Sequence, residues 1–165
     1  MESKAFSEIV RTHQQEIYFF VRRMLLDHDD TNDVVQNTFI KAWKGIKNFR
    51  GDAKISTWLT RIAYNESINF LNKRKKIAGV DFEQVSEKLD NIISEDDLYT
   101  GDEIQQILQL AIATLPEKQK AVFIMKYYKE MKYREMSEIT ETSEGALKAS
   151  YHLAVKKIEY FVNQY

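Results

Sequence analysis

Apolar side chains recur at three- and four-residue steps along most of the chain, which is the spacing that gathers them on one face of an α-helix. One apolar stripe covers residues 6–25, and a second covers residues 34–46 after a polar turn and cap at Asp29 and Asp30. A third helix is predicted to start near Ser56, which can cap it, and to end in a basic cluster. No strand-like alternation extends beyond a few residues, so the sequence predicts an all-α fold.

The helical spacing collapses between residues 79 and 103, where apolar residues are scattered and residues 95–97 form an acidic run. Such a composition is typical of a flexible linker, because it offers too little apolar surface to pack. The spacing resumes at Ile104. We therefore expect two small helical domains, residues 1–78 and 104–165, joined by a flexible acidic linker at 79–103.

The stretch that follows residue 132 predicts a helix-turn-helix. A short amphipathic helix around Met136 leads into a polar turn at 140–142, and Ser143 can cap a longer helix. The outward side of that longer helix carries polar or charged groups at four-residue steps: Glu144, Lys148, His152 and Lys156. This face suits a DNA major groove. An ordinary αα-hairpin with a solvated outer face has the same pattern, so the spacing alone leaves both interpretations open.

Composition narrows the class of protein. With 165 residues, of which 44% are hydrophobic, the chain can form one ordinary domain or two small ones. It has no cysteine, which excludes disulfides and thiolate nucleophiles and indicates a reducing compartment. The N-terminal residues lack the basic start and apolar core of a signal peptide, and no apolar run approaches the ~18 residues needed to span a membrane. We expect a cytoplasmic protein without membrane insertion.

The net charge of −1 conceals a strong asymmetry along the chain. Residues 1–78 carry 14 Lys and Arg against 9 Asp and Glu, residues 79–105 carry 1 against 9, and residues 106–165 carry 9 against 7. Two mildly basic lobes thus flank an acidic joint, as expected of a nucleic-acid binder whose acidic linker offsets its basic faces. A solvated interdomain loop with a chance charge bias would give the same counts.

Catalytic chemistry finds little support in the sequence. The histidines His13, His28 and His152 are far apart and lack the spacing of a helical metal pair, so with no cysteine we expect no metal and no cofactor. No glycine-rich phosphate loop is present. Neighbouring aspartates at a helix start more often cap the helix and offset its dipole than act as an acid and a base. The chain is therefore not expected to be an enzyme.

A series of short motifs occupies most of both predicted domains. The first domain contains Asp33-Val34-Val35-Gln36, Thr38-Phe39, Ala42-Trp43, Phe49-Arg50-Gly51-Asp52, Thr57-Trp58-Leu59, Arg61-Ile62-Ala63 and Asn65. In order and spacing these motifs resemble region 2 of the extracytoplasmic-function (ECF) sigma factors, members of the sigma-70 family of bacterial RNA polymerase subunits. The second domain resembles their region 4, through Leu115-Pro116-Glu117-Lys118-Gln119 and a helix-turn-helix with Ser143, Gly145 and Lys148. Linked motifs in one order are far more specific than any single motif.

The resemblance implies a protein that binds core RNA polymerase and directs promoter recognition, DNA melting and transcription initiation. In this family the second helix of region 2 docks on a coiled coil of the largest polymerase subunit, and the flap of the second-largest subunit is a further contact. The polymerase-facing residues would be Asp30, Asp33, Gln36, Asn37, Lys41 and Trp43. Plain core packing is the alternative role for Trp43.

The loop from Phe49 to Ser56 and the following helix correspond to the part of the family that recognises the minus-ten promoter element. That task takes a base out of its stack; Gly51 allows close backbone approach, Asn65 offers an amide, and aromatic side chains can stack. Phe49 and Trp58 are equally typical core residues. The DNA contacts that the resemblance implies are Phe49, Arg50, Gly51, Asp52, Lys54, Ser56, Trp58, Arg61, Asn65, Lys73, Arg74, Lys75 and Lys76.

Region 4 would bind the minus-thirty-five element in the major groove. The residues implied are Ser143, Glu144, Ala146, Lys148, Ala149, His152 and Lys156. Ala146, Ala149, Ser150 and Leu153 stand where many relatives have Thr, Ser, Arg and Arg. This face therefore has fewer bidentate donors and can depend more on duplex shape. Glu141 occupies a turn position that is frequently glycine.

Three other hypotheses concern function and regulation. A stand-alone helix-turn-helix transcriptional regulator would bind duplex DNA tightly without polymerase, whereas a helical adaptor would have no DNA role and salt-insensitive behaviour. An anti-sigma factor that clamps the two lobes is a common partner in the family, and a flexible acidic joint would permit the compact and extended states that such control requires.

Overall fold

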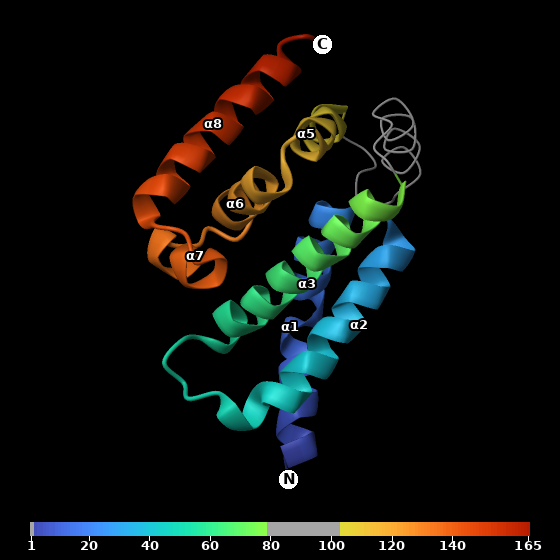
Figure 1. Cartoon of the computed structure of the whole chain (residues 1–165), viewed down its shortest axis with the longest axis vertical. Coiled ribbons are helices and arrows are strands. Elements are labelled where there is room, and N and C mark those ends of the chain that lie inside the picture. The colour runs from blue at the N-terminus through green and yellow to red at the C-terminus, as the bar shows by residue number, and fades with distance from the viewer. Residues whose placement is uncertain (1, 79–102) are drawn as a thin grey trace.

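Figure 1 shows the computed structural model, which describes residues 2–78 and 103–165. All regular elements of the described residues are helices, which confirms the predicted all-α fold. They are α1 (Glu2–Leu25), α2 (His28–Gly45), the short 3-10 helix η1 (Ile46–Asn48), α3 (Ile55–Ala78), α5 (Glu103–Ala113), α6 (Glu117–Tyr127), α7 (Tyr133–Thr140) and α8 (Glu144–Val162). The linker predicted at 79–103 lies outside the described residues, apart from Glu103 at the start of α5.

Helices α1, α2 and α3 form the first lobe around an apolar core. Ile17 and Phe20 from α1, Val34 from α2, and Leu59 and Ala63 from α3 are almost fully buried. Burying such side chains removes apolar surface from water at roughly 25 cal/mol per Å², which is the main stabilisation available to a small lobe. This packing fixes the directions in which the polar faces of α2 and α3 point.

Two helix starts differ from the prediction. The cap of α2 is Asp27, whose carboxylate accepts a hydrogen bond from the backbone N–H of Asp30 at 2.9 Å. Asp29 and Asp30 instead lie in the first turn, where carboxylates stabilise the positive end of the helix dipole. Helix α3 begins at Ile55, and the Ser56 hydroxyl bonds to a carboxylate of α1. In α3 a tertiary contact therefore replaces the local cap that the sequence predicts.

Helices α5 to α8 form the second lobe, with α6 at its centre. The residues of α6 from Ala121 to Met125 are all buried, because α5, α8 and α1 of the first lobe pack around this helix. Helices α7 and α8 form the predicted helix-turn-helix. The turn places Glu141 in the left-handed region at φ 57°, a conformation that favours glycine, so the missing glycine noted in the sequence corresponds to a strained backbone position.

The two lobes pack against each other. Helix α3 contacts α7, and α1 contacts α5 and α6, so the second lobe lies along one side of the three-helix bundle (Figure 1). Buried apolar side chains of both lobes belong to one continuous cluster. The contact between the lobes is thus part of the core, and it also contains buried polar groups.

Lys120 on α6 is one of these buried polar groups, and its ammonium lies 3.4 Å from the carbonyl oxygen of Met24 on α1. Burial lowers the pKa of Lys120 from 10.5 to about 8; the charge of Glu117 opposes this shift and that of Lys75 adds to it. Because the pKa is lower in the packed state than in an exposed lysine, the charged ammonium destabilises that state. The destabilisation is complete below pH about 8 and disappears as the pH rises to 10.5.

Replacing this ammonium with a neutral group of similar length should stabilise the protein. We expect Lys120→Met to raise the free energy of unfolding at pH 7 by on the order of 1–3 kcal/mol. The gain should shrink between pH about 8 and pH 10.5, where the parent lysine loses its charge. Denaturant titrations across this range measure it, with the exposed Lys118→Met as control. A less stable Lys120→Met variant at pH 7 would show that the ammonium makes a net attractive contact.

Candidate nucleic-acid and polymerase interfaces

A pocket of about 390 Å³ opens on the first lobe between α2, η1 and α3. Helix α3 provides most of its lining, because side chains three, four and seven residues apart share one helix face. The lining residues are Lys41 and Gly45 of α2, Asn48 of η1, and Trp58, Ile62, Asn65, Glu66 and Asn69 of α3.

The pocket combines apolar surface with amide groups. Trp58 and Ile62 supply the apolar surface. Asn48, Asn65 and Asn69 supply amides, each of which can both donate and accept hydrogen bonds. An unstacked nucleic-acid base requires this combination, because its face needs an aromatic or apolar surface and its edge needs hydrogen-bonding partners. The pocket is therefore chemically suited to hold a single base.

Residues predicted for two different partners meet in this pocket. Asn65 and Trp58, both expected to contact the minus-ten element, line it together. Lys41, expected at the polymerase interface, lines it too and forms an ion pair with Glu66 that joins α2 to α3. Lys41 is exposed at the edge of the pocket, and its contact with polymerase stays a prediction.

The sequence does not predict five of the lining residues as site residues: Gly45, Asn48, Ile62, Glu66 and Asn69. Asn69 follows Asn65 by four residues, so helical spacing could have identified it. Asn48 lies in η1, and only the packing of α2 on α3 brings it to the pocket. No local pattern signals a contact of that kind.

The loop between η1 and α3 exposes polar side chains. Gly51 adopts φ 78°, in the left-handed region that other residues rarely enter. Arg50, Asp52 and Lys54 are exposed around it. Phe49 instead packs on Trp58, with 5.0 Å between ring centroids, and Trp58 in turn lies against the core. The core role that the sequence left open is therefore present in the structure for Trp58.

Among the described side chains, several predicted phosphate contacts already have a carboxylate partner. The pairs are Arg61 with Glu141 at 2.9 Å, Arg74 with Asp30 at 2.9 Å, and Lys75 with Glu117 at 2.7 Å. Asp30 was expected to face polymerase, whereas Glu141 and Glu117 belong to the second lobe. Lys73 is exposed, and Lys76 lies near the end of α3.

One face of α2 is exposed and mixed in character. Asp33, Gln36 and Asn37 are exposed. Trp43 is 45% exposed, although its ring meets Phe6 edge-on with 5.0 Å between centroids. Plain core packing therefore does not account for Trp43. A half-exposed indole beside polar side chains is typical of a protein interface.

Helix α8 presents the side chains predicted for the major groove. The exposed ones are Glu144, Ala146, Lys148, Ala149, His152 and Lys156. Ser143 caps the helix, because its hydroxyl oxygen accepts a hydrogen bond from the Ala146 N–H at 3.2 Å. The Lys148 ammonium lies 5.7 Å from the centre of the Tyr133 ring on α7. The helix thus offers a cationic group and small side chains on one open face.

Residues 2–78 and 103–165 contain neither a candidate metal cluster nor a candidate membrane span. In those ranges no cluster of three or more histidine or acidic side chains is arranged to hold a metal ion. No helix there has the length and apolar character required to traverse a bilayer.

Comparison with known proteins identifies relatives over nearly the whole chain. The Sigma-70 region 2 family model matches residues 9–77, and the Sigma-70, region 4 model matches residues 105–158. The ECF RNA polymerase sigma factor SigW of Bacillus subtilis is 31% identical over 160 residues, which cover 92% of this chain and 85% of SigW. The ECF RNA polymerase sigma-E factor of Escherichia coli K12 is 29% identical over 166 residues, covering 96% and 86%.

Solved structures share the fold. The sigma factor RpoE of Bartonella quintana, in complex with the anti-sigma factor NepR, has a TM-score of 0.78 and 20% identity over 97% of this chain and 98% of that chain. CnrH, in complex with the cytosolic domain of CnrY, has a TM-score of 0.71 and 19% identity over 98% and 90% of the two chains.

A helical lobe of the region 2 type followed by a helix-turn-helix lobe of the region 4 type defines a transcription initiation factor. The chain belongs to the ECF sigma factors of bacterial RNA polymerase. The family predicted from the motifs is confirmed. A stand-alone helix-turn-helix regulator is not favoured, because the match includes region 2 as well as region 4.

The α8 cap allows helix stability to be separated from DNA contact. Ser143→Ala removes the side-chain oxygen that pairs with the Ala146 N–H and should lower the free energy of unfolding by about 1 kcal/mol. Ser143→Asp keeps an acceptor and should retain most of the stability, while its charge repels phosphate. Thermal unfolding and DNA binding measured on both variants test this. An alanine variant as stable as the parent would argue that the cap contributes nothing.

Proposed function

We propose that this sigma factor holds an unstacked base of the minus-ten element in the pocket between α2 and α3. The observation that supports the proposal most is the pocket itself, which is lined by the side chains of Asn48, Asn65 and Asn69 together with Trp58. The pocket belongs to the segment that matches region 2. Holding a base outside the duplex favours the melted state, since unstacking a base costs a few kcal/mol that the pocket contacts must offset.

The exposed cations near the pocket provide the sequence-independent part of binding. Arg50 and Lys54 in the loop, Arg61 on α3 and the basic end of the same helix can approach backbone phosphates on either side of the captured base. Their contribution should weaken with salt, because it comes from the release of counterions from DNA. They position the lobe, and the pocket supplies base preference.

Helix α8 is the second DNA contact, in the major groove of the minus-thirty-five element. Lys148 is its main candidate for a base or phosphate contact, with His152 and Lys156 further along the same face. The exposed Ala146 and Ala149 have methyl side chains, which can fit against the groove but cannot form hydrogen bonds with bases. We therefore assign this helix a weaker base preference than the pocket.

The mixed face of α2 is the proposed polymerase contact. Trp43 would anchor it, and Asp33, Gln36 and Asn37 would meet the coiled coil of the largest subunit, while the second lobe meets the flap of the second-largest. An anti-sigma factor that binds both lobes is a further proposed partner, because the similar fold of the Bartonella quintana sigma factor RpoE was solved in complex with an anti-sigma factor. These proposed roles follow the predicted domain boundaries. Residues 1–78 would contact polymerase and the minus-ten element, residues 79–103 would link the lobes, and residues 104–165 would contact the minus-thirty-five element.

Run-off transcription tests the proposal. The purified chain and core RNA polymerase are incubated with fragmented genomic DNA, and the transcript starts are sequenced. We expect a set of starts that share one minus-ten and one minus-thirty-five sequence. Absence of any start that depends on the added chain would contradict the proposal.

Variants of the pocket should change the minus-ten preference selectively. We expect Asn65→Ala and Asn69→Ala each to lower transcript yield about tenfold and to weaken the minus-ten preference, since a base-edge contact is worth about 1–3 kcal/mol. Asn72→Ala, exposed on the same helix and outside the pocket, is the matched control. If all three variants lose the same activity, the pocket has no special role.

A further inference from the structure

We propose that Leu153 of α8 is a specificity-determining residue, which selects thymine in the minus-thirty-five element by packing against the methyl group of that base. Leu153 is 49% exposed, although leucine is among the residue types most often buried. This role rests on the proposed placement of α8 in the major groove. It adds the chemical group that the helix recognises there.

Packing of the second lobe does not account for Leu153. Helix α8 packs through Leu147, Ala154 and Ile158, all of which are buried. Each residue advances an α-helix by about 100°, so Leu153 lies about 100° or more from these three residues around the helix axis. A single exposed leucine is common on protein surfaces, so its neighbours decide whether it belongs to a binding surface.

Leu153 shares one side of α8 with two exposed alanines. Ala146, Ala149 and Leu153 follow each other at steps of three and four residues, which places them in one apolar strip along the helix. The strip is roughly 10 Å long, because an α-helix rises about 1.5 Å per residue, and this length corresponds to about three base-pair steps. The small alanines allow the helix to approach the bases closely, and Leu153 extends further from the helix.

Lysine side chains border the apolar strip on both sides. Lys148 and Lys156 lie on one side of it and Lys157 on the other. The Lys157 ammonium donates a hydrogen bond to the side-chain oxygen of Gln119 at 3.0 Å, and this uncharged partner leaves the positive charge of the lysine uncompensated. Bases form the floor of the major groove and phosphates form its rims, so an apolar strip with cationic borders complements both.

Thymine is the base that matches the apolar strip. It alone among the four bases presents a methyl group, at C5, in the major groove. Alanine and leucine side chains have no hydrogen-bonding atoms, so the strip distinguishes bases by apolar contact. Burial of one group of this size corresponds to about a fourfold change in affinity. Helix α8 therefore favours thymine at one or two positions of the element.

Replacing thymine with deoxyuridine tests this contact, because uracil lacks the methyl group and keeps the hydrogen-bonding groups of thymine. The parent chain and limiting core RNA polymerase transcribe templates in which each thymine of the minus-thirty-five element is replaced singly. We expect replacement at one or two positions to lower transcript yield about fourfold. Deoxyuridine in the spacer between the two promoter elements is the template control and should leave the yield unchanged.

Variants of Leu153 connect the methyl effect to this side chain. Leu153→Ala shortens the side chain and should make the yield insensitive to deoxyuridine, whereas Leu153→Met keeps an apolar side chain of similar length and should retain the sensitivity. Tyr160→Ala is the matched control, because it removes another large side chain, 71% exposed, nearer the C-terminal end of the same helix. It should behave as the parent. Circular dichroism checks that all three variants fold.

The outcomes separate this role of Leu153 from the function proposed above. A loss of yield with deoxyuridine that occurs in the parent and disappears in Leu153→Ala supports the role. Equal yields from the two kinds of template, or a loss that Leu153→Ala leaves unchanged, overturn it while promoter-dependent transcription stays intact. A minus-thirty-five element without thymine on either strand overturns it as well. Absence of transcripts from the unmodified template overturns the proposed function and, with it, this role.

Discussion

Helix α3 packs against α1, α2 and α7 at once, and the rest of the structure depends on how it divides its faces among them. Leu59 and Ala63 are buried, which fixes the rotation of the helix. Because each residue advances the helix by about 100°, that rotation also directs Arg61 toward α7 and Asn65 into the pocket with Trp58. The core packing of α3, its share of the pocket lining and its contact with α7 are therefore consequences of one helix orientation.

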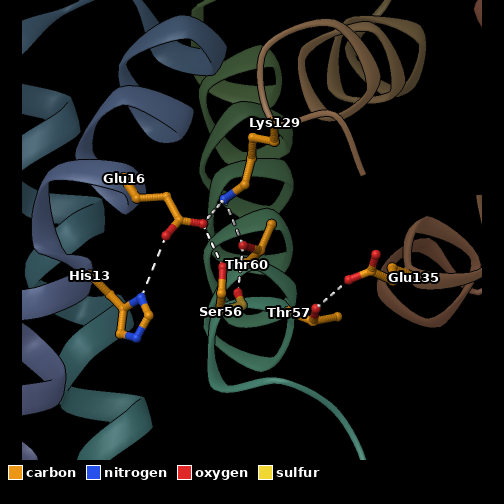
Figure 2. A network of polar contacts seen from close by, with 7 residues as sticks. All are labelled: His13, Glu16, Ser56, Thr57, Thr60, Lys129 and Glu135. Atoms are coloured by element: carbon orange, nitrogen blue, oxygen red, sulfur yellow. Dashed lines mark hydrogen bonds and ion pairs between the residues drawn. The ribbon is translucent and has the colours of Figure 1, made fainter. Parts of the chain in front are cut away.

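Buried charged groups both stabilise and destabilise the contact between the lobes. The buried Lys120 ammonium destabilises the packed state at neutral pH. The Lys129 ammonium, in contrast, contacts the Glu16 carboxylate and donates a hydrogen bond to the Thr60 hydroxyl in that state (Figure 2). Ion pairs with little solvent around them contribute small net energies, because desolvation offsets most of their attraction. The polar contacts between the lobes therefore add little net free energy to the packing of their apolar side chains.

The fold could be predicted from the sequence because helix formation depends on spacing, and the apolar stripes had clear spacing. The pocket could be predicted in part: Asn65 came from a motif, whereas Asn48 reaches it through tertiary packing. The prediction that Ser56 caps α3 was wrong, because the Ser56 hydroxyl instead donates a hydrogen bond to Glu16, which is distant in the sequence. The contacts of Lys129 with Glu16 and of Thr57 with Glu135 have no sequence signal, since no local pattern encodes which helices pack together.

The central claim is that α3 carries the part of the chain that holds the melted promoter. Site-specific photocrosslinking tests it most directly, with a photoreactive amino acid at position 69 in the pocket and, for comparison, at position 37 on the exposed face of α2. In the open complex with polymerase, position 69 should crosslink to an unpaired base of the minus-ten element, and position 37 should crosslink to polymerase protein. Crosslinks from position 69 to polymerase alone, with none to DNA, would contradict the account.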